Sequence, residues 1–529
     1  MIHAAHVEKG SGCDKGLVVP RDERLAVHKS LLIIAALAAL VVAGASSGAP
    51  AKPVAPLPFV VGATEDQVLG FDDGGAAVYA SMTSHLLGAI RVSVDYEPSE
   101  PTTVQQKDQL ERALVAAREK NMRVILGIQP GHNTDVTGDP NGVRKFAAYT
   151  ALVARTFPSV NDFVVGNEPN LGRFWFPTFK ANGSIASAAT YEAALAASYD
   201  ALKALRADIN VIGLAVSPKG DDRPGSARNT ISPVRFIKAV GDAYRKSGRK
   251  KPIMDSVALH PYPFTNTDPP DKGAPWPQIS VANLDRGEQA FWDGFNGTAQ
   301  PTFQEAGVQR AQSGAPVRWL LDEAGWQTDT RGLPGYSGSE NTPTIDEATQ
   351  AQYYKQVIQR YACDNHVGAL LFFHWIDEAD RDRLQSGLTR ANRAMKPAAN
   401  AVRDAIVTGC QGGPVLWKHS TKVDGASSTW KPKNGNLFAV KAFEDGTFVA
   451  TATPKKAALA RAKRLHQKLR AVKVKGKIKA YTQTGVKFKG IKYANSRTYT
   501  YSVKITSSLN AKRSVTLKTK KIKKPDSEL

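Results

Sequence analysis

Eight short apolar runs, each bounded by turn residues, alternate with helical patterns along the middle of the chain. The runs are rich in Val, Ile, Leu and Phe, and they cover Phe59–Ala63, Ala89–Val94, Arg123–Ile128, Asp162–Gly166, Val211–Val216, Ser256–His260, Val317–Leu321 and Ala369–Trp375. Helical spacing between them is found, for example, in Val104–Asn121, Val143–Thr156, Tyr191–Arg206, Pro233–Ser247 and Ile345–Cys363, with a last helix from Pro397 to Ile406. Strands buried on both faces give continuous apolar runs, and parallel strands need helical crossovers.

Eight such repeats in residues 56–410 predict an α/β fold, a closed (β/α)₈ TIM barrel with some long loops. An open doubly wound sheet is the alternative. A Gly-rich phosphate loop should then follow the first strand, but Gly62-Ala63-Thr64-Glu65 stands there. The barrel is therefore the favoured architecture.

The end of the chain differs from the barrel region in its charge and in the spacing of its apolar residues. The net charge is +22, and residues 411–529 hold nearly all of it, with about 28 Lys and Arg against about 5 Asp and Glu. Residues 411–416 are expected to be a linker, and residues 417–529 a basic, β-rich domain similar to a small β-sandwich. Short alternating runs indicate its strands, at Thr447–Thr453, Val472–Tyr481, Thr498–Ile505 and Ser514–Lys521, with a helix expected over Pro454–Arg470.

The N-terminal region, residues 1–51, is interpreted as an extension that ends in a signal peptide. Residues 30–45 are apolar, His28 and Lys29 precede them, and small residues follow. The run is shorter than the ~20 apolar residues of a membrane span, although an uncleaved anchor is the alternative. We therefore expect a secreted or cell-surface protein.

Export makes the cysteines informative. Cys13 lies in the N-terminal extension, which leaves Cys363 and Cys410 as a pair in an oxidising compartment. The sequence favours a disulfide between them, and two separate buried thiols are the alternative. Two cysteines without clustered histidines do not make a zinc site of the usual ligand count, so no metal is expected.

Two acidic stretches follow the fourth and seventh apolar runs. They are Gly166-Asn167-Glu168-Pro169-Asn170 and Leu321-Asp322-Glu323-Ala324-Gly325-Trp326. Barrel enzymes carry their chemistry at the C-terminal ends of the strands, where these two stretches fall. Cleaving a glycosidic bond in the common way needs two carboxyl groups fixed on either side of it. Glu168 and Glu323 are therefore the predicted catalytic pair.

In these motifs the sequence resembles clan A of the glycoside hydrolases, the retaining (β/α)₈ enzymes that include cellulases, mannanases and β-xylosidases. Asn167-Glu168-Pro169 matches the clan's acid/base motif after strand four, and Glu323 matches its nucleophile after strand seven. The resemblance covers roughly residues 56–408. It implies hydrolysis of β-linked, equatorial bonds, typically in glucan, xylan or mannan, with no metal or organic cofactor.

Further positions agree with the clan's pattern. Arg91 looks like the strand-two arginine that supports the nucleophile, and His260 with Tyr262 looks like its His-x-Tyr after strand six. By the same resemblance Asn167 would hold the sugar's 2-hydroxyl, and Trp375 would form the floor of the cleavage subsite. Strand three departs from the cellulase-type pattern with Gly127-Ile128-Gln129-Pro130, followed by His132, which leaves the family within the clan open.

Several of these residues also have a simpler interpretation. Trp175 and Trp326, close after the two glutamates, are expected to stack on sugar rings, and loop anchors are the equal alternative. Arg91 could pair with a nearby acid, and His260 and Trp375 could belong to the core. Charge from Arg91 and a hydrogen bond from Tyr262 are expected to keep the pKa of Glu323 low.

The expected partner is a carbohydrate substrate, bound by a monomer. The basic domain is predicted to adhere to an anionic cell-envelope polymer or an acidic polysaccharide, with a merely solvated cationic face as the alternative. Nucleic acid is not expected, because few aromatic residues lie among the lysines. Two other functions stay open for the whole chain, a non-catalytic carbohydrate-binding envelope protein and a transglycosylase that uses the same two glutamates.

Overall fold

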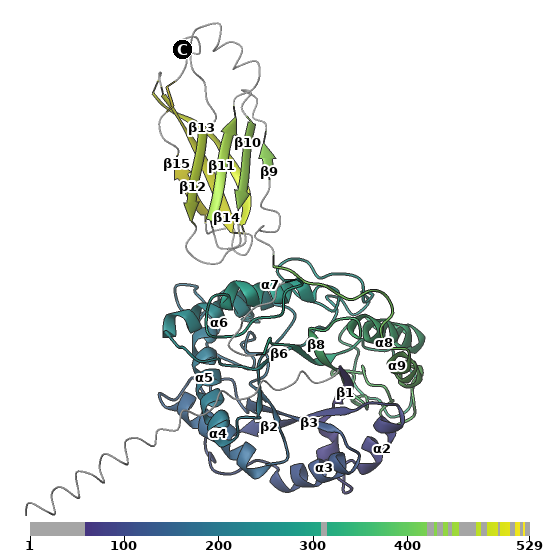
Figure 1. Ribbon diagram of the computed structural model, residues 1–529. Coiled ribbons are helices and arrows are strands. Elements are labelled where there is room, and N and C mark those ends of the chain that lie inside the picture. Colours follow the sequence, from purple (N-terminus) through teal and green to yellow (C-terminus); the bar gives the residue numbers. More distant parts are fainter. Residues whose placement is uncertain are drawn as a thin grey trace, which may run out of the picture. The chain divides into compact units, whose positions relative to one another are not determined.

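The computed structural model describes residues 59–307 and 315–419, and strand backbones between residues 428 and 523 (Figure 1). The predicted signal peptide and the helix expected over Pro454–Arg470 lie outside the described residues. Within the described part, no helix combines the length and the hydropathy needed to cross a membrane.

Eight parallel strands close into a barrel, because β1 pairs with β8 as well as with β2. In the register of this sheet, Thr64 lies beside Arg91 on one side and Phe373 on the other. Closure confirms the predicted barrel and excludes the open sheet. The strands are β1 (Val60–Thr64), β2 (Ala89–Tyr96), β3 (Arg123–Pro130), β4 (Asp162–Val165), β5 (Asn210–Val216), β6 (Ser256–Leu259), β7 (Trp319–Ala324) and β8 (Val367–Phe373).

Helices surround the barrel, as Figure 1 shows. Their apolar side chains face the strands with helical spacing; α3, for example, buries Leu110, Ala113, Leu114 and Ala117. The helical elements are η1 (Asp66–Gly70), α2 (Ala76–Ser84), α3 (Lys107–Glu119), α4 (Gly142–Thr156), α5 (Ser187–Leu205), α6 (Pro233–Ser247), α7 (Leu284–Phe295), α8 (Glu347–Tyr361) and α9 (Pro397–Thr408). The helices predicted from the sequence correspond to α3, α4, α5, α6, α8 and α9.

Small and branched side chains that come only from strands fill the interior of the barrel. Their cluster is separate from the one between strands and helices, and it consists of Ala89, Ile125, Val164, Ile212, Ala215, Ala258, Leu320, Ala369 and Leu371. Burial of each Ile, Leu or Val contributes about 1.5–3 kcal/mol. Side chains alternate along a strand, so residues two positions further on face the same way. The next inward-facing layer, toward the C-terminal ends, therefore contains Arg91, His260, Asp322 and Phe373.

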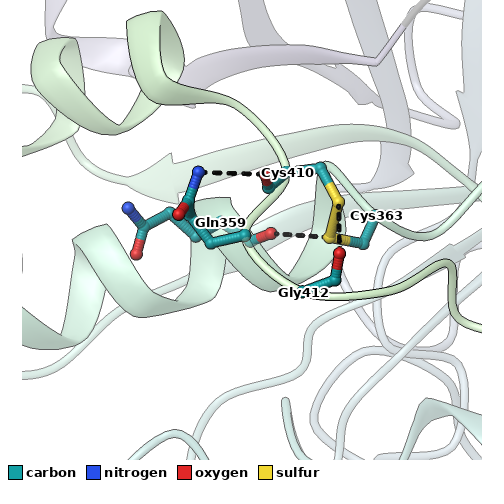
Figure 2. Close-up of a disulfide and its surroundings, with 5 residues drawn as sticks. Gln359, Cys363, Cys410 and Gly412 are labelled. Carbon is teal, nitrogen blue, oxygen red and sulfur yellow. Dashed lines mark hydrogen bonds between the residues drawn. A yellow bond between two sulfur atoms is a disulfide. The ribbon is translucent and has the colours of Figure 1, made fainter.

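The structure contains the disulfide between Cys363 and Cys410, which follow α8 and α9 (Figure 2). The two Cα atoms are 4.7 Å apart, and 47 positions separate the residues in the sequence. The bond joins the chain at the ends of consecutive outer helices. This is the arrangement that the sequence favoured over two separate thiols.

The segment after the disulfide packs on the barrel. The amide of Val415 donates to the carbonyl of Cys363 (3.0 Å), and that of Ala306 donates to the carbonyl of Trp417 (2.8 Å). Trp417 is only 6% exposed and belongs to the main core. The packed unit therefore extends past the expected linker, 411–416, at least as far as Trp417.

The described strands beyond residue 428 form two antiparallel sheets. One has the order β12-β11-β10-β9, and the other has the order β13-β14-β15, with β16 paired to β14. The strands are β9 (Ser428–Trp430), β10 (Leu437–Ala442), β11 (Thr447–Thr453), β12 (Val472–Lys477), β13 (Thr484–Asn495), β14 (Thr498–Ser507), β15 (Ser514–Lys518) and β16 (Ile522–Lys523). Each strand expected here has a counterpart, and the sandwich arrangement stays a prediction.

Candidate active site

Glu168 stands on a sharp turn at the end of β4. Its backbone φ is +39°, and that of Gly166 is +85°. The amide of Gly166 donates to Ile128 (2.7 Å) and the amide of Glu168 donates to Ala215 (2.9 Å), which ties the turn to the two neighbouring strands. A non-glycine residue in the left-handed region costs on the order of 1–3 kcal/mol, and such strain concentrates at functional sites. The fold thus maintains a strained backbone at the predicted acid/base residue.

An extra residue in β7 places two neighbouring acids at the site. In a regular strand Asp322 and Glu323 would face opposite sides of the sheet. Between Leu321 and Ala324 the pairing with β8 shifts, because three steps along β7 match two along β8. This irregularity redirects a side chain, as β-bulges beside active sites do. Both acids consequently reach the same cluster of charges.

The structure brings the two predicted catalytic carboxyl groups together. His260 Nδ1 lies 3.1 Å from Glu168 Oε1 and 3.4 Å from Glu323 Oε2. These two oxygens can thus be no more than about 6.5 Å apart, the sum of the two distances. Glycosidases that retain configuration hold their carboxyl groups about 5–5.5 Å apart, and inverting enzymes hold them about 6.5–9.5 Å apart. The upper bound includes the spacing of retaining enzymes and reaches only the short end of the inverting range.

Both glutamate side chains keep some contact with solvent. Glu168 is 15% exposed and Glu323 is 12% exposed, whereas His260 beneath them is fully buried. A substrate entering from the C-terminal ends of the strands can therefore reach both carboxyl groups. The imidazole of His260 contacts the two carboxyl groups from inside the barrel.

Arg91 holds the nucleophile candidate from the barrel interior. Its Nη1 donates to Glu323 Oε1 (3.0 Å), its Nη2 donates to Asn167 Oδ1 (3.1 Å), and its Nε lies 3.3 Å from Asp322 Oδ2. Gly127 of β3 leaves the necessary room, because a Cβ atom there would lie 2.9 Å from Arg91 Nε. The other oxygen of Glu323 accepts a hydrogen bond from the phenol of Tyr262 (3.2 Å). Both oxygens are thus oriented.

The buried cluster perturbs the titration of its members. Burial disfavours the charged imidazolium of His260, but the charges of Glu323 and Asp322, with the hydrogen bond to Glu168, raise its pKa to about 10. These neighbouring carboxyl groups therefore favour the positively charged form of His260 at neutral pH. Burial also raises the pKa of Glu323, opposed by the charges of His260 and Arg91. The expected low pKa of Glu323 is wrong in direction, because the sequence did not reveal that only 12% of this side chain stays exposed.

The three predicted tryptophans do not line the site. Trp175 and Trp326 are 1% and 0% exposed. Their indole N–H groups donate to Thr190 and to the carbonyl of Asp268, which makes them loop anchors. Trp375 is 2% exposed, and its ring lies 5.6 Å from that of His85 at the end of the outer helix α2. None of the three can offer a free ring face to a sugar.

Other aromatic residues are better placed. Phe373 follows the inward-facing Leu371 by two positions, is partly exposed, and packs edge to face with Tyr262 at 6.4 Å. Phe264, two residues after Tyr262, is 38% exposed. The alternation along β8 could have identified Phe373 in the sequence, because Trp375 lies beyond the last paired residue of that strand.

Two groups of residues among those described have the composition of a cation site. Glu97, His132 and Asp135 form one, and Glu288, Asp364 and His366 form the other. In the second, His366 Nδ1 is 2.9 Å from Glu288 and Nε2 is 2.6 Å from the carbonyl of Gln304, so both ring nitrogens are engaged. Neither group contains a member of the catalytic pair.

The solved structures that are similar to this chain include glycoside hydrolases. A family 39 glycoside hydrolase from Bacteroides cellulosilyticus WH2 shares 16% identity, with 76% of this chain and 71% of that chain covered and a TM-score of 0.45. A GH5_18 protein from Streptomyces cattleya shares 16% identity, with 69% and 83% covered and a TM-score of 0.42. A glucosidase from Croceicoccus marinus shares 12% identity, with 76% and 77% covered and a TM-score of 0.45. No protein-family profile and no curated protein matches the chain.

Proposed function

We propose that the protein is a retaining glycoside hydrolase that cleaves β-linked, equatorial bonds in poly- or oligosaccharides. The observation that carries the proposal is the convergence of Glu168 and Glu323 on one nitrogen of His260. The two residues come from opposite parts of the barrel, and each is partly open to solvent. The upper bound on the separation of their oxygens includes the spacing that a double displacement needs.

In the first step Glu323 attacks the anomeric carbon and Glu168 gives its proton to the departing glycosidic oxygen. Hydrogen bonds from Arg91 and Tyr262 favour the ionised, attacking form of Glu323. One oxygen of Glu168 is directed to His260. The other has no hydrogen-bond partner among the described residues, which leaves it free to deliver the proton.

In the second step Glu168, now ionised, takes a proton from water as the water attacks the anomeric carbon. The bond between sugar and Glu323 breaks, and the product keeps its original configuration. The oxygen of the Asn167 side chain accepts from Arg91, so its NH₂ group is presented to a sugar hydroxyl. A hydrogen bond there would strengthen as charge develops at the ring.

The test is a pair of variants assayed on aryl β-glycosides and on polysaccharides with reducing-end detection. Glu323→Ala should abolish turnover, and azide should restore it with formation of a glycosyl azide of inverted configuration. Glu168→Ala should lose about 10²–10⁴-fold in rate on substrates with poor leaving groups and much less on activated ones. Activity near that of the wild type in Glu323→Ala would refute the assignment of the nucleophile.

The same screen separates the alternatives. A carbohydrate-binding protein without catalytic activity would release no sugar at any enzyme concentration. A transglycosylase would form longer oligosaccharides, because a sugar rather than water attacks the intermediate. The proposal expects free reducing ends as the main product.

We further propose that the enzyme is exported and that its basic C-terminal region adheres to an anionic envelope polymer or acidic polysaccharide. The disulfide supports export, because such bonds persist in oxidising compartments. The charge of residues 411–529 supports adhesion. Binding of the full chain to anionic beads should fall steeply with salt, and retention at high salt would contradict an electrostatic mode.

A further inference from the structure

Asp322, next to the nucleophile candidate, has no part in the chemistry described so far. It is fully buried. Its Oδ2 lies 3.3 Å from Arg91 Nε, and its Oδ1 lies 3.4 Å from His260 Nε2. The hydroxyl of Thr64 donates to its backbone carbonyl (2.5 Å), which anchors this part of β7. Asp322 thus touches both cations that hold the catalytic pair, from the side away from the substrate.

We propose that Asp322 is a positioning residue that sets the number of protons on the catalytic pair. The inference rests on the proposed glycosidase function and deepens it. Asp322 does not touch the substrate. It acts through Arg91 and His260, which in turn contact Glu323 and Glu168.

The first part of the argument is a balance of charges. Arg91 and His260 contribute two positive charges, and both side chains are buried. Asp322, Glu323 and Glu168 contribute three carboxyl groups. A buried charge without a partner costs several kcal/mol, so the cluster favours neutrality. Neutrality requires one proton on the three carboxyl groups, and a retaining glycosidase begins its reaction with one protonated acid.

The second part concerns which carboxyl group carries the proton. Asp322 lies against two cations. Glu323 accepts hydrogen bonds from Arg91 and Tyr262, and the charges of Arg91 and His260 oppose the rise of its pKa on burial. Glu168 contacts a single cation and is the most exposed of the three. On these contacts the proposal assigns the shared proton to Glu168, the group that must donate it.

Without the charge of Asp322, two cations would face two catalytic carboxyl groups. The cluster would then be neutral with both of them ionised, and the acid would lack its proton. Alternatively, His260 would give up its own proton. In either case the cluster holds one proton fewer at a given pH. In this proposal the negative charge of Asp322 is the reason why the two buried cations, Arg91 and His260, do not draw the proton away from Glu168.

Other titratable groups face this cluster from every side. Tyr262 follows β6 and donates to Glu323, and Tyr191 of α5 donates to the carbonyl of Val165 and accepts from the amide of Leu214. Asp66 of η1 acts on Arg91 through its charge, but this residue is exposed, so solvent screens the charge. Burial raises the pKa of both phenols, so they stay neutral at working pH. The groups that decide the balance are therefore Arg91, His260, Asp322, Glu323 and Glu168.

The first experiment follows the ring nitrogens of His260 by NMR in the whole protein, with His260→Gln to assign the signals. In the wild type both nitrogens should stay protonated between about pH 5 and pH 8. In Asp322→Asn the titration of His260 should move down by about one to three pH units, because a neighbouring negative charge is gone. Asp377→Asn is the matched control. That residue is also buried and paired with a cation, Lys396, but has no contact with the catalytic pair.

The second experiment measures kcat/KM against pH. In Asp322→Asn the alkaline limb of this profile should move to lower pH, because a negative charge is removed from the cluster that holds the acid. In His260→Gln the acidic limb should move to higher pH, because Glu323 loses a neighbouring positive charge. A merely structural role for Asp322 would lower stability and activity without shifting either limb, as expected for Asp377→Asn.

Two results would overturn the inference. One is a wild-type His260 that titrates near its ordinary value of about 6.5. The other is an Asp322→Asn variant in which neither the histidine nor the alkaline limb moves by more than about half a pH unit. If that variant fails to fold, the wild-type titration and the shift in His260→Gln still decide. Failure of the glycosidase proposal would show as absent turnover in the wild type, while the NMR titration would stay measurable.

Discussion

Replacing Arg91 with lysine tests the geometry of the site without changing its charge. Arg91 reaches Glu323, Asn167 and Asp322 with three different nitrogen atoms. A lysine has a single nitrogen on a flexible stem, so it can replace only one of these contacts. Two hydrogen bonds or ion pairs to charged or buried partners are lost. At about 1.5–3 kcal/mol each, the loss is about 3–6 kcal/mol.

This energy is divided between folding and catalysis. If all of it were lost in the transition state, kcat/KM of Arg91→Lys would fall by about 10²–10⁴, since 1.4 kcal/mol corresponds to a factor of ten. The assay is kcat/KM on an aryl β-glycoside, combined with urea unfolding of the same preparation. The sum of the two losses should lie in the calculated range. A variant with both quantities within about twofold of the wild type would refute the orienting role of Arg91.

Arg123→Lys is the control for this substitution. Arg123 binds both oxygens of Asp162, at 2.9 and 2.6 Å, at the N-terminal ends of β3 and β4. The same chemical change at this opposite end of the barrel should lower stability. Its kcat/KM should stay within about twofold of the wild type.

Two further predictions concern stability and the aromatic residues. Replacing Cys363 and Cys410 together with serine should lower the free energy of unfolding by about 4 kcal/mol, from the 47 positions between them, and leave kcat/KM unchanged; urea unfolding and steady-state kinetics check this. Phe373→Ala should raise KM or lower kcat/KM by about two- to tenfold, whereas Trp326→Phe should lower stability by about 1–3 kcal/mol with KM unchanged. The opposite pattern, with KM sensitive to Trp326 and not to Phe373, would contradict their placement.

The barrel and the convergence of the acids could be predicted from the sequence because both follow from periodic patterns. Eight apolar runs joined by helical crossovers predict a closed parallel barrel. The C-terminal ends of strands four and seven then lie at the same end of that barrel. The contacts of these side chains follow from the same register, since Arg91 faces inward from β2 and both His260 and Tyr262 follow the end of β6. These are consequences of alternation and topology, which a sequence displays directly.

The aromatic residues could not be placed in this way. Trp175 and Trp326 follow the glutamates closely in the sequence, but each sits in a loop that folds back, so closeness along the chain did not mean closeness to the mouth. The prediction of a low pKa for Glu323 failed for a related reason. Its charged neighbours were predicted, but the loss of solvent around it depends on loops from several strands.

The irregularity in β7 links the catalytic pair to its charge balance. Alternation alone would send Glu323 away from the interior if Asp322 faced inward. The extra residue between Leu321 and Ala324 allows both carboxyl groups to meet Arg91, one at Nε and one at Nη1. A single guanidinium therefore orients Glu323, the proposed nucleophile, and pairs with Asp322. The neighbouring acids of β7 thus differ in their surroundings, because Glu323 keeps some contact with solvent and Asp322 is fully buried against two cations.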